Sequence, residues 1–330
     1  MGPSNGAGGR AGGPAGLPAG TWDPENILAA LERWMRQDVG HGRPSPLTLA
    51  SYRSDTKQHL LWLAERELTP AGVTAAVLEE YRAHLAGQYK ASTVGRKVAS
   101  VRRFYQLAHA HGLLKVNPAQ ALKAPASRGA PARRVKYLSL VTLKALLAAT
   151  DAARAPEAAV RDKAILALMS IHGLRVCEVS RLDVDDVHLA AGEAGEAGEL
   201  QVLGKGGKRR KVYLTRETRL CIARWLAVRR LLRPPTAALF VALSGPAERI
   251  STRGLRGVVD RYLLRVGSKR EGVSCHALRH TYATQSLAAG ASLLAVSGSL
   301  GHASVTPTQV YAQLVEHALS NPAAFLKGVL

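Results

Sequence analysis

Residues 275–314 read CHALRHTYATQSLAAGASLLAVSGSLGHASVTPTQVYAQL, a stretch in which basic side chains precede one tyrosine. His276, Arg279 and His280 stand at i, i+3 and i+4, so a helix places all three on one face. His302 follows them, and Tyr311 comes nine positions after His302. Histidine and arginine can position a phosphate, neutralise its charge and move protons around it, and a phenol can attack it. The stretch therefore predicts phosphodiester chemistry with Tyr311 as the nucleophile.

Two upstream segments supply further cations. In GLRVCEVSRL, residues 173–182, Arg175 begins a predicted helix, where an arginine can hold a phosphate through two hydrogen bonds and Glu178 can hold the arginine. In VLGKGGKRRKVYL, residues 202–214, Lys205 lies in a glycine-flanked turn between two predicted strands. This turn is no nucleotide-binding loop, because it lacks the G-x-x-x-x-G-K-[ST] pattern and precedes a strand.

Taken in chain order, these residues resemble the conserved set of the tyrosine recombinase (phage integrase) family. That set corresponds to Arg175, Lys205, His276, Arg279, His302 and Tyr311. The family pattern G-K-G-x-K-x-R selects Lys205 and leaves Lys208 and Arg210 as predicted phosphate contacts. The family pattern H-x-x-R needs only His276 and Arg279, so His280 is interpreted as a structural residue that hydrogen-bonds a neighbouring loop. Pro307 departs from the threonine usual at that place in the family.

The resemblance implies a mainly α fold with a small β-sheet: an all-helical, SAM-like, DNA-binding N-terminal domain followed by an α+β catalytic domain. It also implies site-specific strand exchange by transesterification, through a 3′-phosphotyrosine intermediate and a Holliday junction. No metal, nucleotide or other cofactor is needed, because transesterification conserves the bond energy. The expected assembly is a homo- or heterotetramer on double-stranded DNA. A type IB topoisomerase and a noncatalytic DNA-binding protein on the same fold remain as alternatives, and the target sequence and biological task stay open.

Composition supports a polyanionic partner. The 330 residues carry 45 Lys and Arg against 24 Asp and Glu, for a formal charge of +21 and a pI near 10.4. Nucleic acid is favoured over a membrane surface, because the basic residues are spread through both halves and no apolar stretch has membrane-spanning length. The cysteines at 177, 221 and 275 form no Cys-x-x-Cys pair, which predicts neither a disulfide framework nor a zinc site. A reducing, cytoplasmic setting is expected.

Patterning divides the chain into four parts: a disordered glycine-rich tail (1–20), a helical domain (21–122), a Pro- and Arg-rich linker (123–137) and a catalytic domain (138–330). Four helices are expected in the first domain, beginning near Asp23, Ser45, Thr74 and Ser92. On the fourth helix, Arg96 and Arg103 share a face that is predicted to lie along a DNA backbone. In the second domain, strands 200–203 and 209–214 form a hairpin among several helices.

Overall fold

The computed structural model describes residues 22–38, 44–124, 135–153, 155–189, 198–204, 207–301, 306 and 308–312. The chain divides into two compact units, residues 1–131 and 132–330. The predicted tail, most of the predicted linker, Lys205 and His302 lie outside the described residues. The boundaries drawn from the sequence, with a linker over 123–137, therefore stay a prediction.

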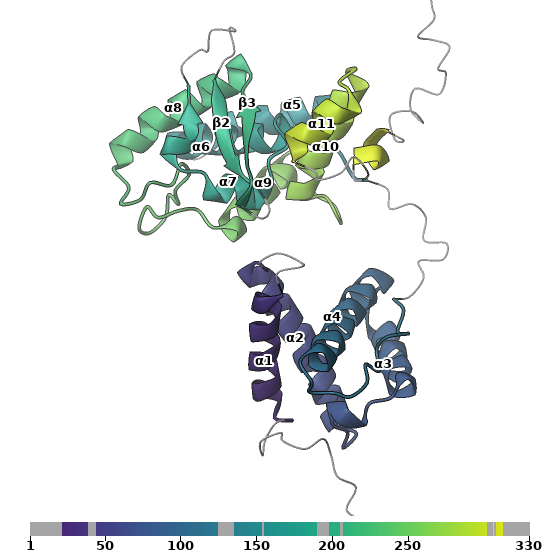
Figure 1. Cartoon of the computed structure of the whole chain (residues 1–330). Coiled ribbons are helices and arrows are strands. Elements are labelled where there is room, and N and C mark those ends of the chain that lie inside the picture. Colours follow the sequence, from purple (N-terminus) through teal and green to yellow (C-terminus); the bar gives the residue numbers. More distant parts are fainter. Residues whose placement is uncertain are drawn as a thin grey trace, which may run out of the picture. The chain divides into compact units, whose positions relative to one another are not determined.

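The first unit is a helical bundle of α1 (Pro24–Gln37), α2 (Pro46–Ala64), α3 (Ala75–Gln88) and α4 (Ala91–Ala110), with a short 3-10 turn, η2 (Pro70–Gly72) (Figure 1). Side chains at the helix starts satisfy backbone N–H groups that have no partner within the helix. Asp23 accepts from Glu25 and Asn26, Ser45 accepts from Thr48, and Thr74 accepts from Val77.

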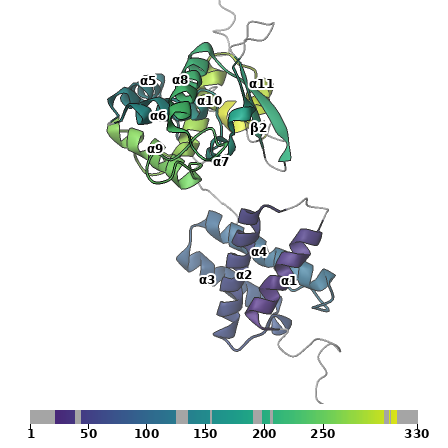
Figure 2. The same ribbon diagram turned by 90° about the vertical axis from the view of Figure 1, so that its left-hand side faces the viewer.

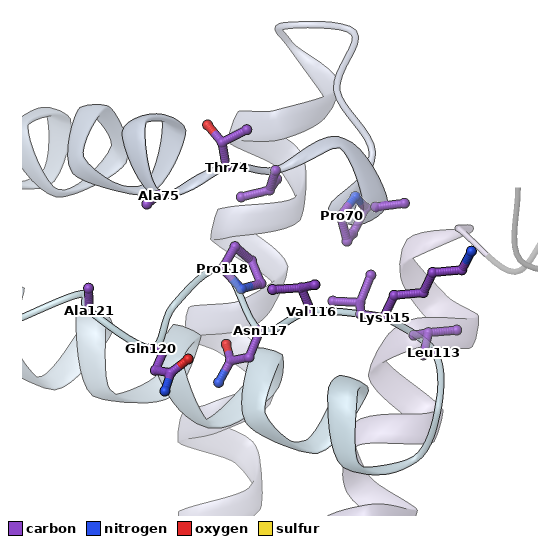
Figure 3. A pocket seen from close by; sticks show the side chains of 13 residues that line it. Pro70, Thr74, Ala75, Leu113, Lys115, Val116, Asn117, Pro118, Gln120 and Ala121 are labelled. Carbon is purple, nitrogen blue, oxygen red and sulfur yellow. The ribbon is translucent and has the colours of Figure 1, made fainter. Parts of the chain in front are cut away.

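The apolar faces of these four helices converge on one core. Leu28, Leu31, Leu78, Leu85 and Phe104 are fully buried there. α2 packs against both α1 and α4, and Figure 2 shows the same bundle from the side. An apolar hollow lies next to this core, between the 70–75 segment and the 113–121 segment (Figure 3).

The second unit combines helices with a small sheet. Its helical elements are α5 (Leu140–Ala148), η3 (Ala149–Ala152), α6 (Pro156–Ser170), α7 (Val176–Arg181), η4 (Val184–Asp186), α8 (Arg216–Leu232), α9 (Thr252–Arg265), α10 (Cys275–Ala288) and α11 (Leu293–Leu300). The strands β1 (Val187–His188), β2 (Glu199–Leu203) and β3 (Arg209–Tyr213) form an antiparallel sheet in the order β1-β2-β3. The mainly helical fold class predicted from the sequence is confirmed.

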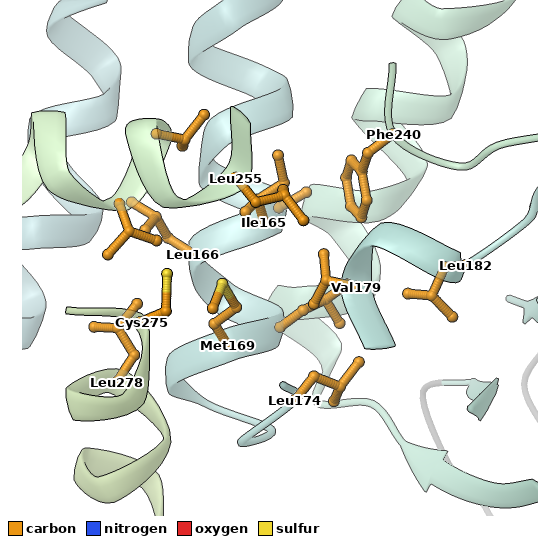
Figure 4. Close-up of a cluster of buried hydrophobic side chains, with 14 of the residues drawn as sticks. Ile165, Leu166, Met169, Leu174, Val179, Leu182, Phe240, Leu255, Cys275 and Leu278 are labelled. Atoms are coloured by element: carbon orange, nitrogen blue, oxygen red, sulfur yellow. The ribbon is translucent and has the colours of Figure 1, made fainter. Parts of the chain in front are cut away.

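Helix α6 occupies the centre of this unit, because its second half, residues 164–170, is buried on every side. Ile165, Leu166 and Met169 are fully buried, and α6 contacts α8, α9 and α10 (Figure 4). Cys275, at the start of α10, packs into the same cluster, and burial raises the pKa of its thiol to about 11. The prediction of a buried structural thiol is confirmed. Contacts with α6 therefore position α10, which carries Arg279, and α7, which Arg175 directly precedes.

Candidate active site

Arg175 is positioned by the start of α7. It is the residue that precedes the first turn of the helix, and the carboxylate of Glu178 accepts from its backbone N–H at 2.8 Å. The other carboxylate oxygen accepts from Arg175 Nη1 at 2.9 Å. Glu178 therefore caps the helix and orients the guanidinium at once. The Arg175 side chain is 31% exposed, so part of the guanidinium remains accessible beside these bonds.

Arg279 reaches the same place from α10. It is 5% exposed, and its guanidinium donates to the carbonyls of Gly173 and Leu300, each at 2.7 Å. Arg175 Nη1 donates to the same Leu300 carbonyl at 3.3 Å. Burial and the charge of Arg175 lower the pKa of Arg279 to about 10. The two arginines, 104 positions apart in the sequence, therefore meet at the end of α11.

Gly173 permits this close approach. It has a positive φ of 65°, and a Cβ at that position would lie 2.4 Å from the Tyr282 ring of α10. Neither the backbone conformation nor the contact tolerates a side chain. Gly173, two positions before Arg175, therefore allows the α6–α7 turn to lie against α10, where its carbonyl accepts from Arg279.

Arg210 of β3 joins the cluster through Glu178. Its Nη1 and Nη2 donate to the two carboxylate oxygens at 2.9 and 3.0 Å, and its Nε donates to the carbonyl of Ser299 at 3.0 Å. Burial would raise the pKa of Glu178, but the hydrogen bond from Arg210 and those from Arg175 hold it below its usual value. Two arginines, Arg175 and Arg210, thus hold one carboxylate with Arg279 close by, and the excess positive charge suits a phosphate.

Tyr311 lies beside this cluster in the short helical segment 308–312, and it is 6% exposed. Its side chain packs with Val296 and Leu300 of α11 and with Ala283 of α10. The hydroxyl oxygen lies 2.7 Å from Nδ1 of His280. Burial raises the pKa of the phenol, although the charges of Arg279 and Arg175 act in the opposite direction.

The two histidines of α10 differ in their surroundings. His276 is exposed and His280 is half-buried, and their ring centroids are 6.3 Å apart. The sequence predicts a hydrogen bond from His280 to a neighbouring loop, but it does not name Tyr311 as the partner that the structure shows. The i, i+4 spacing from His276 was the available signal, but the sequence alone did not place Tyr311 against that face.

The structure thus brings together Arg175, Arg279 and Tyr311, with His276 on the same helix as Arg279. Lys205 and His302 lie outside the described residues. The catalytic roles predicted for all six residues stay predictions at this point.

The four residues predicted to contact DNA have varied surroundings. Lys208 is exposed. Arg96 is half-exposed and pairs with Asp55, and Arg103 has a 14% exposed side chain that pairs with Asp38. The guanidinium of Arg210 forms an ion pair with Glu178, so it helps hold the arginine cluster together. DNA contact by these four residues stays a prediction.

No group of three or more His, Cys, Asp or Glu side chains among the described residues could hold a metal ion. No helix in the described ranges is both long and apolar enough to cross a membrane. All three cysteines are free thiols.

Two arginines, an exposed histidine and a buried tyrosine are gathered on this fold, and known proteins with the same sequence features identify its family. The chain belongs to the phage integrase family of tyrosine site-specific recombinases: residues 136–317 match the Phage integrase family, and residues 31–112 match the phage integrase N-terminal SAM-like domain. The resemblance seen in the sequence is confirmed.

Curated relatives match most of the chain. Tyrosine recombinase XerC of Rhodospirillum centenum is 37% identical over 302 residues, which cover 88% of this chain and 84% of the relative. Tyrosine recombinase XerD of Vibrio cholerae is 32% identical over 274 residues, with coverage of 82% and 87%.

Solved structures share the fold. XerH bound to a palindromic difH substrate, a post-cleavage complex, gives a TM-score of 0.74 at 18% identity, covering 92% of this chain and 97% of that one. A lambda integrase dimer bound to a COC′ core site gives 0.60 at 17% identity, covering 86% and 76%. At these identities the likeness concerns the fold alone.

Proposed function

We propose that this recombinase cuts and rejoins DNA through Tyr311, which attacks the scissile phosphate and becomes joined to the DNA 3′ end. The observation that carries the proposal is the pair of arginines, Arg175 and Arg279, that share the Leu300 carbonyl beside a buried tyrosine. Guanidinium groups in a partly buried place stabilise the charge that develops on the nonbridging oxygens.

The other family positions complete the chemistry. Lys205 protonates the departing 5′ oxygen, His276 assists proton transfer from its exposed place on α10, and His302 hydrogen-bonds the phosphate. The bond energy is kept in the phosphotyrosine link, so the reaction needs no nucleotide or metal. The catalytic roles of Lys205 and His302 are assigned from the motifs G-K-G-x-K-x-R and L-G-H in this sequence.

The partner is double-stranded DNA at a recombination site. Relatives of this fold include XerH and lambda integrase, whose structures hold DNA substrates. The charge of +21 supports the same partner for this chain.

The two units would act as a clamp on the duplex, with Arg96, Arg103 and Lys208 near its backbone. Two duplexes would be held by a tetramer, in which strands exchange through a Holliday junction. The free cysteines suit the reducing cytoplasm.

Capture of DNA tests this function. Nicked suicide duplexes drawn from the native genome are incubated with the full chain in EDTA, and covalent adducts are separated on denaturing gels. We expect adducts in chelator, because arginine, lysine and histidine supply the charge that a metal would otherwise supply. Cleavage that disappears in EDTA and returns with Mg²⁺ contradicts the mechanism.

The same captured duplex separates the alternatives. A recombinase exchanges strands between two copies of the site. A type IB topoisomerase relaxes one supercoiled duplex without exchange, and a noncatalytic protein forms no adduct. Relaxation without exchange, or binding without an adduct, contradicts the proposal.

A further inference from the structure

The hydroxyl of Tyr311 lies against a base that the family pattern does not use. Nδ1 of His280 is 2.7 Å from the phenolic oxygen, and the ring centroids are 5.4 Å apart. The two residues are 31 positions apart in the sequence. The contact is made because Tyr311 packs onto the α10–α11 pair, through Ala283 on α10 and Leu300 on α11.

The phenol must lose a proton when it attacks. Burial raises the pKa of Tyr311, and the opposing charges of Arg279 and Arg175 do not reverse that shift. The hydroxyl is therefore protonated at neutral pH. Among the described residues, α10 brings His280 and Arg279 to bear on the phenol, with His276 near His280, and the start of α7 contributes Arg175. Tyr282 of α10 packs against the same cluster, but its hydroxyl donates to Ser299 Oγ, and α11 carries no titratable side chain. Arginines accept no proton at this pH.

Within the part of the chain that the structure describes, the group of this set that can accept the proton is a histidine. When the imidazole is neutral and carries its hydrogen on Nε2, the lone pair of Nδ1 accepts a hydrogen bond from the phenol. The observed distance is that of such a bond. His276 is exposed one turn earlier on the helix, where a substrate phosphate can reach it, whereas half-buried His280 faces the nucleophile.

We propose that His280 is a catalytic residue: its Nδ1 takes the phenolic proton of Tyr311 as the tyrosine attacks. This inference rests on the proposed function and adds a residue to it. The Oη–P bond forms, the proton moves to Nδ1 and leaves an imidazolium, and the P–O5′ bond breaks with its electron pair on O5′, which Lys205 protonates. On resealing, the 5′-hydroxyl attacks the phosphorus, Lys205 takes the hydroxyl proton back, and His280 returns its proton to the phenolate.

Single-turnover cleavage tests this step. His280→Asn keeps an acceptor near the position of Nδ1, because the amide oxygen of asparagine is similarly placed, but it takes no proton at neutral pH. On the suicide duplex captured by the wild-type chain, we expect adduct formation to slow by about 10²- to 10⁴-fold with DNA affinity unchanged. The defect shrinks as pH rises, because the phenol then ionises without help. A His280→Asn rate within a few-fold of wild type, or a defect that is equal at every pH, overturns the proposal.

A bridging 5′-sulfur substrate separates the two proton transfers. Sulfur leaves without protonation, so this substrate restores cleavage to Lys205→Ala and not to His280→Asn. Equal rescue of both variants assigns His280 to the leaving group and overturns the proposal. If wild type forms no adduct on any duplex, or Tyr311→Phe still forms one, it is the proposed function that fails.

A measurement without DNA tests the bond itself. The full chain is labelled with ¹⁵N-histidine, and the His280 signals are assigned by their loss in His280→Asn. We expect Tyr311→Phe to shift the Nδ1 resonance of His280, because the donor is removed. An unchanged resonance shows that the hydrogen bond is absent, and the proposal is then wrong.

Discussion

Glu178 is the residue on which the arginine cluster depends. It is 3% exposed, and its two carboxylate oxygens accept from Arg175 and Arg210, which come from α7 and β3. A buried carboxylate that loses a cationic partner keeps its desolvation cost without the compensating attraction. Arg210, predicted from the sequence as a phosphate contact, therefore has a structural role in holding Glu178, and through Glu178 it helps hold Arg175.

Removal of this cation has a measurable cost. We expect Arg210→Ala to lower the free energy of unfolding by about 3 kcal/mol, because a buried ion pair is broken on one side. The matched control is Arg209→Ala, since Arg209 is the neighbouring residue on β3, has a 65% exposed side chain and pairs only loosely with Asp186 at 3.6 Å. The control is expected to change stability by less than about 1 kcal/mol. Urea unfolding of the full chain measures both, and equal losses would show that Arg210 has no structural role.

At this scale the sequence predicted residue types better than contacts. Arg175, Arg279 and Tyr311 were identified because their local motifs are distinctive. The contact of Arg210 with Glu178 and the contact of Tyr311 with His280 could not be predicted, because each joins segments that meet only after folding. A run such as Lys208 to Lys211 offers four similar cations, and only the sheet register shows which one turns toward α7.

Helix α2 contains a buried histidine that makes the stability of the first unit depend on pH. His59 is fully buried, its Nε2 lies 2.9 Å from the Tyr105 hydroxyl, and its ring packs against Trp62 and Tyr81. Burial lowers the pKa of His59 from its ordinary 6.5 to about 3. Between these values the unfolded chain binds a proton that the folded chain does not, so this contribution to stability is present above 6.5 and is lost as pH falls toward 3.

The corresponding prediction concerns the first unit. Moving from pH 7 to pH 5 is expected to cost it about 2 kcal/mol through His59, from the difference between the two pKa values. His59→Gln keeps a polar atom near Nε2 but does not titrate, so its stability in that unit should fall less over the same range. Urea unfolding followed by tryptophan fluorescence reports mainly on this unit, because Trp22, Trp34 and Trp62 lie in it and only Trp225 lies in the second. An equal pH dependence in the two proteins contradicts the assignment.

Regular elements could be predicted because their signals are local. Capping side chains at Asp23, Ser45 and Thr74 and the apolar periodicity that follows each mark the first three helices, and alternation marks the β2–β3 hairpin. The two-residue strand β1 and the 3-10 turns were not predicted, because segments this short cannot show a periodic pattern of apolar residues. Their formation depends on tertiary contacts, such as the pairing of Val187 with Leu200.

On the scale of the whole molecule, charge is spread over both units, which supports a clamp. We expect DNA affinity to fall steeply with salt, since a clamp that contacts on the order of ten phosphates gives a log-log slope near −0.9 per phosphate. Residues 132–330 form a compact unit with its own core and can be compared with the full chain. Gel shifts over a range of salt concentrations should give this unit weaker binding and a shallower slope. If it equals the full chain in both, the first unit does not contact DNA.

The central claim is that Tyr311 is the nucleophile, and the site of DNA attachment tests it most directly. The adduct trapped on a suicide duplex is digested with protease and nuclease, and mass spectrometry locates the residue that carries the nucleotide. We predict that the nucleotide is on Tyr311, and that Tyr311→Phe, which keeps the ring and the packing but lacks the hydroxyl, binds the same duplex and forms no adduct. Attachment at any other residue, or an adduct that persists in Tyr311→Phe, would contradict the account.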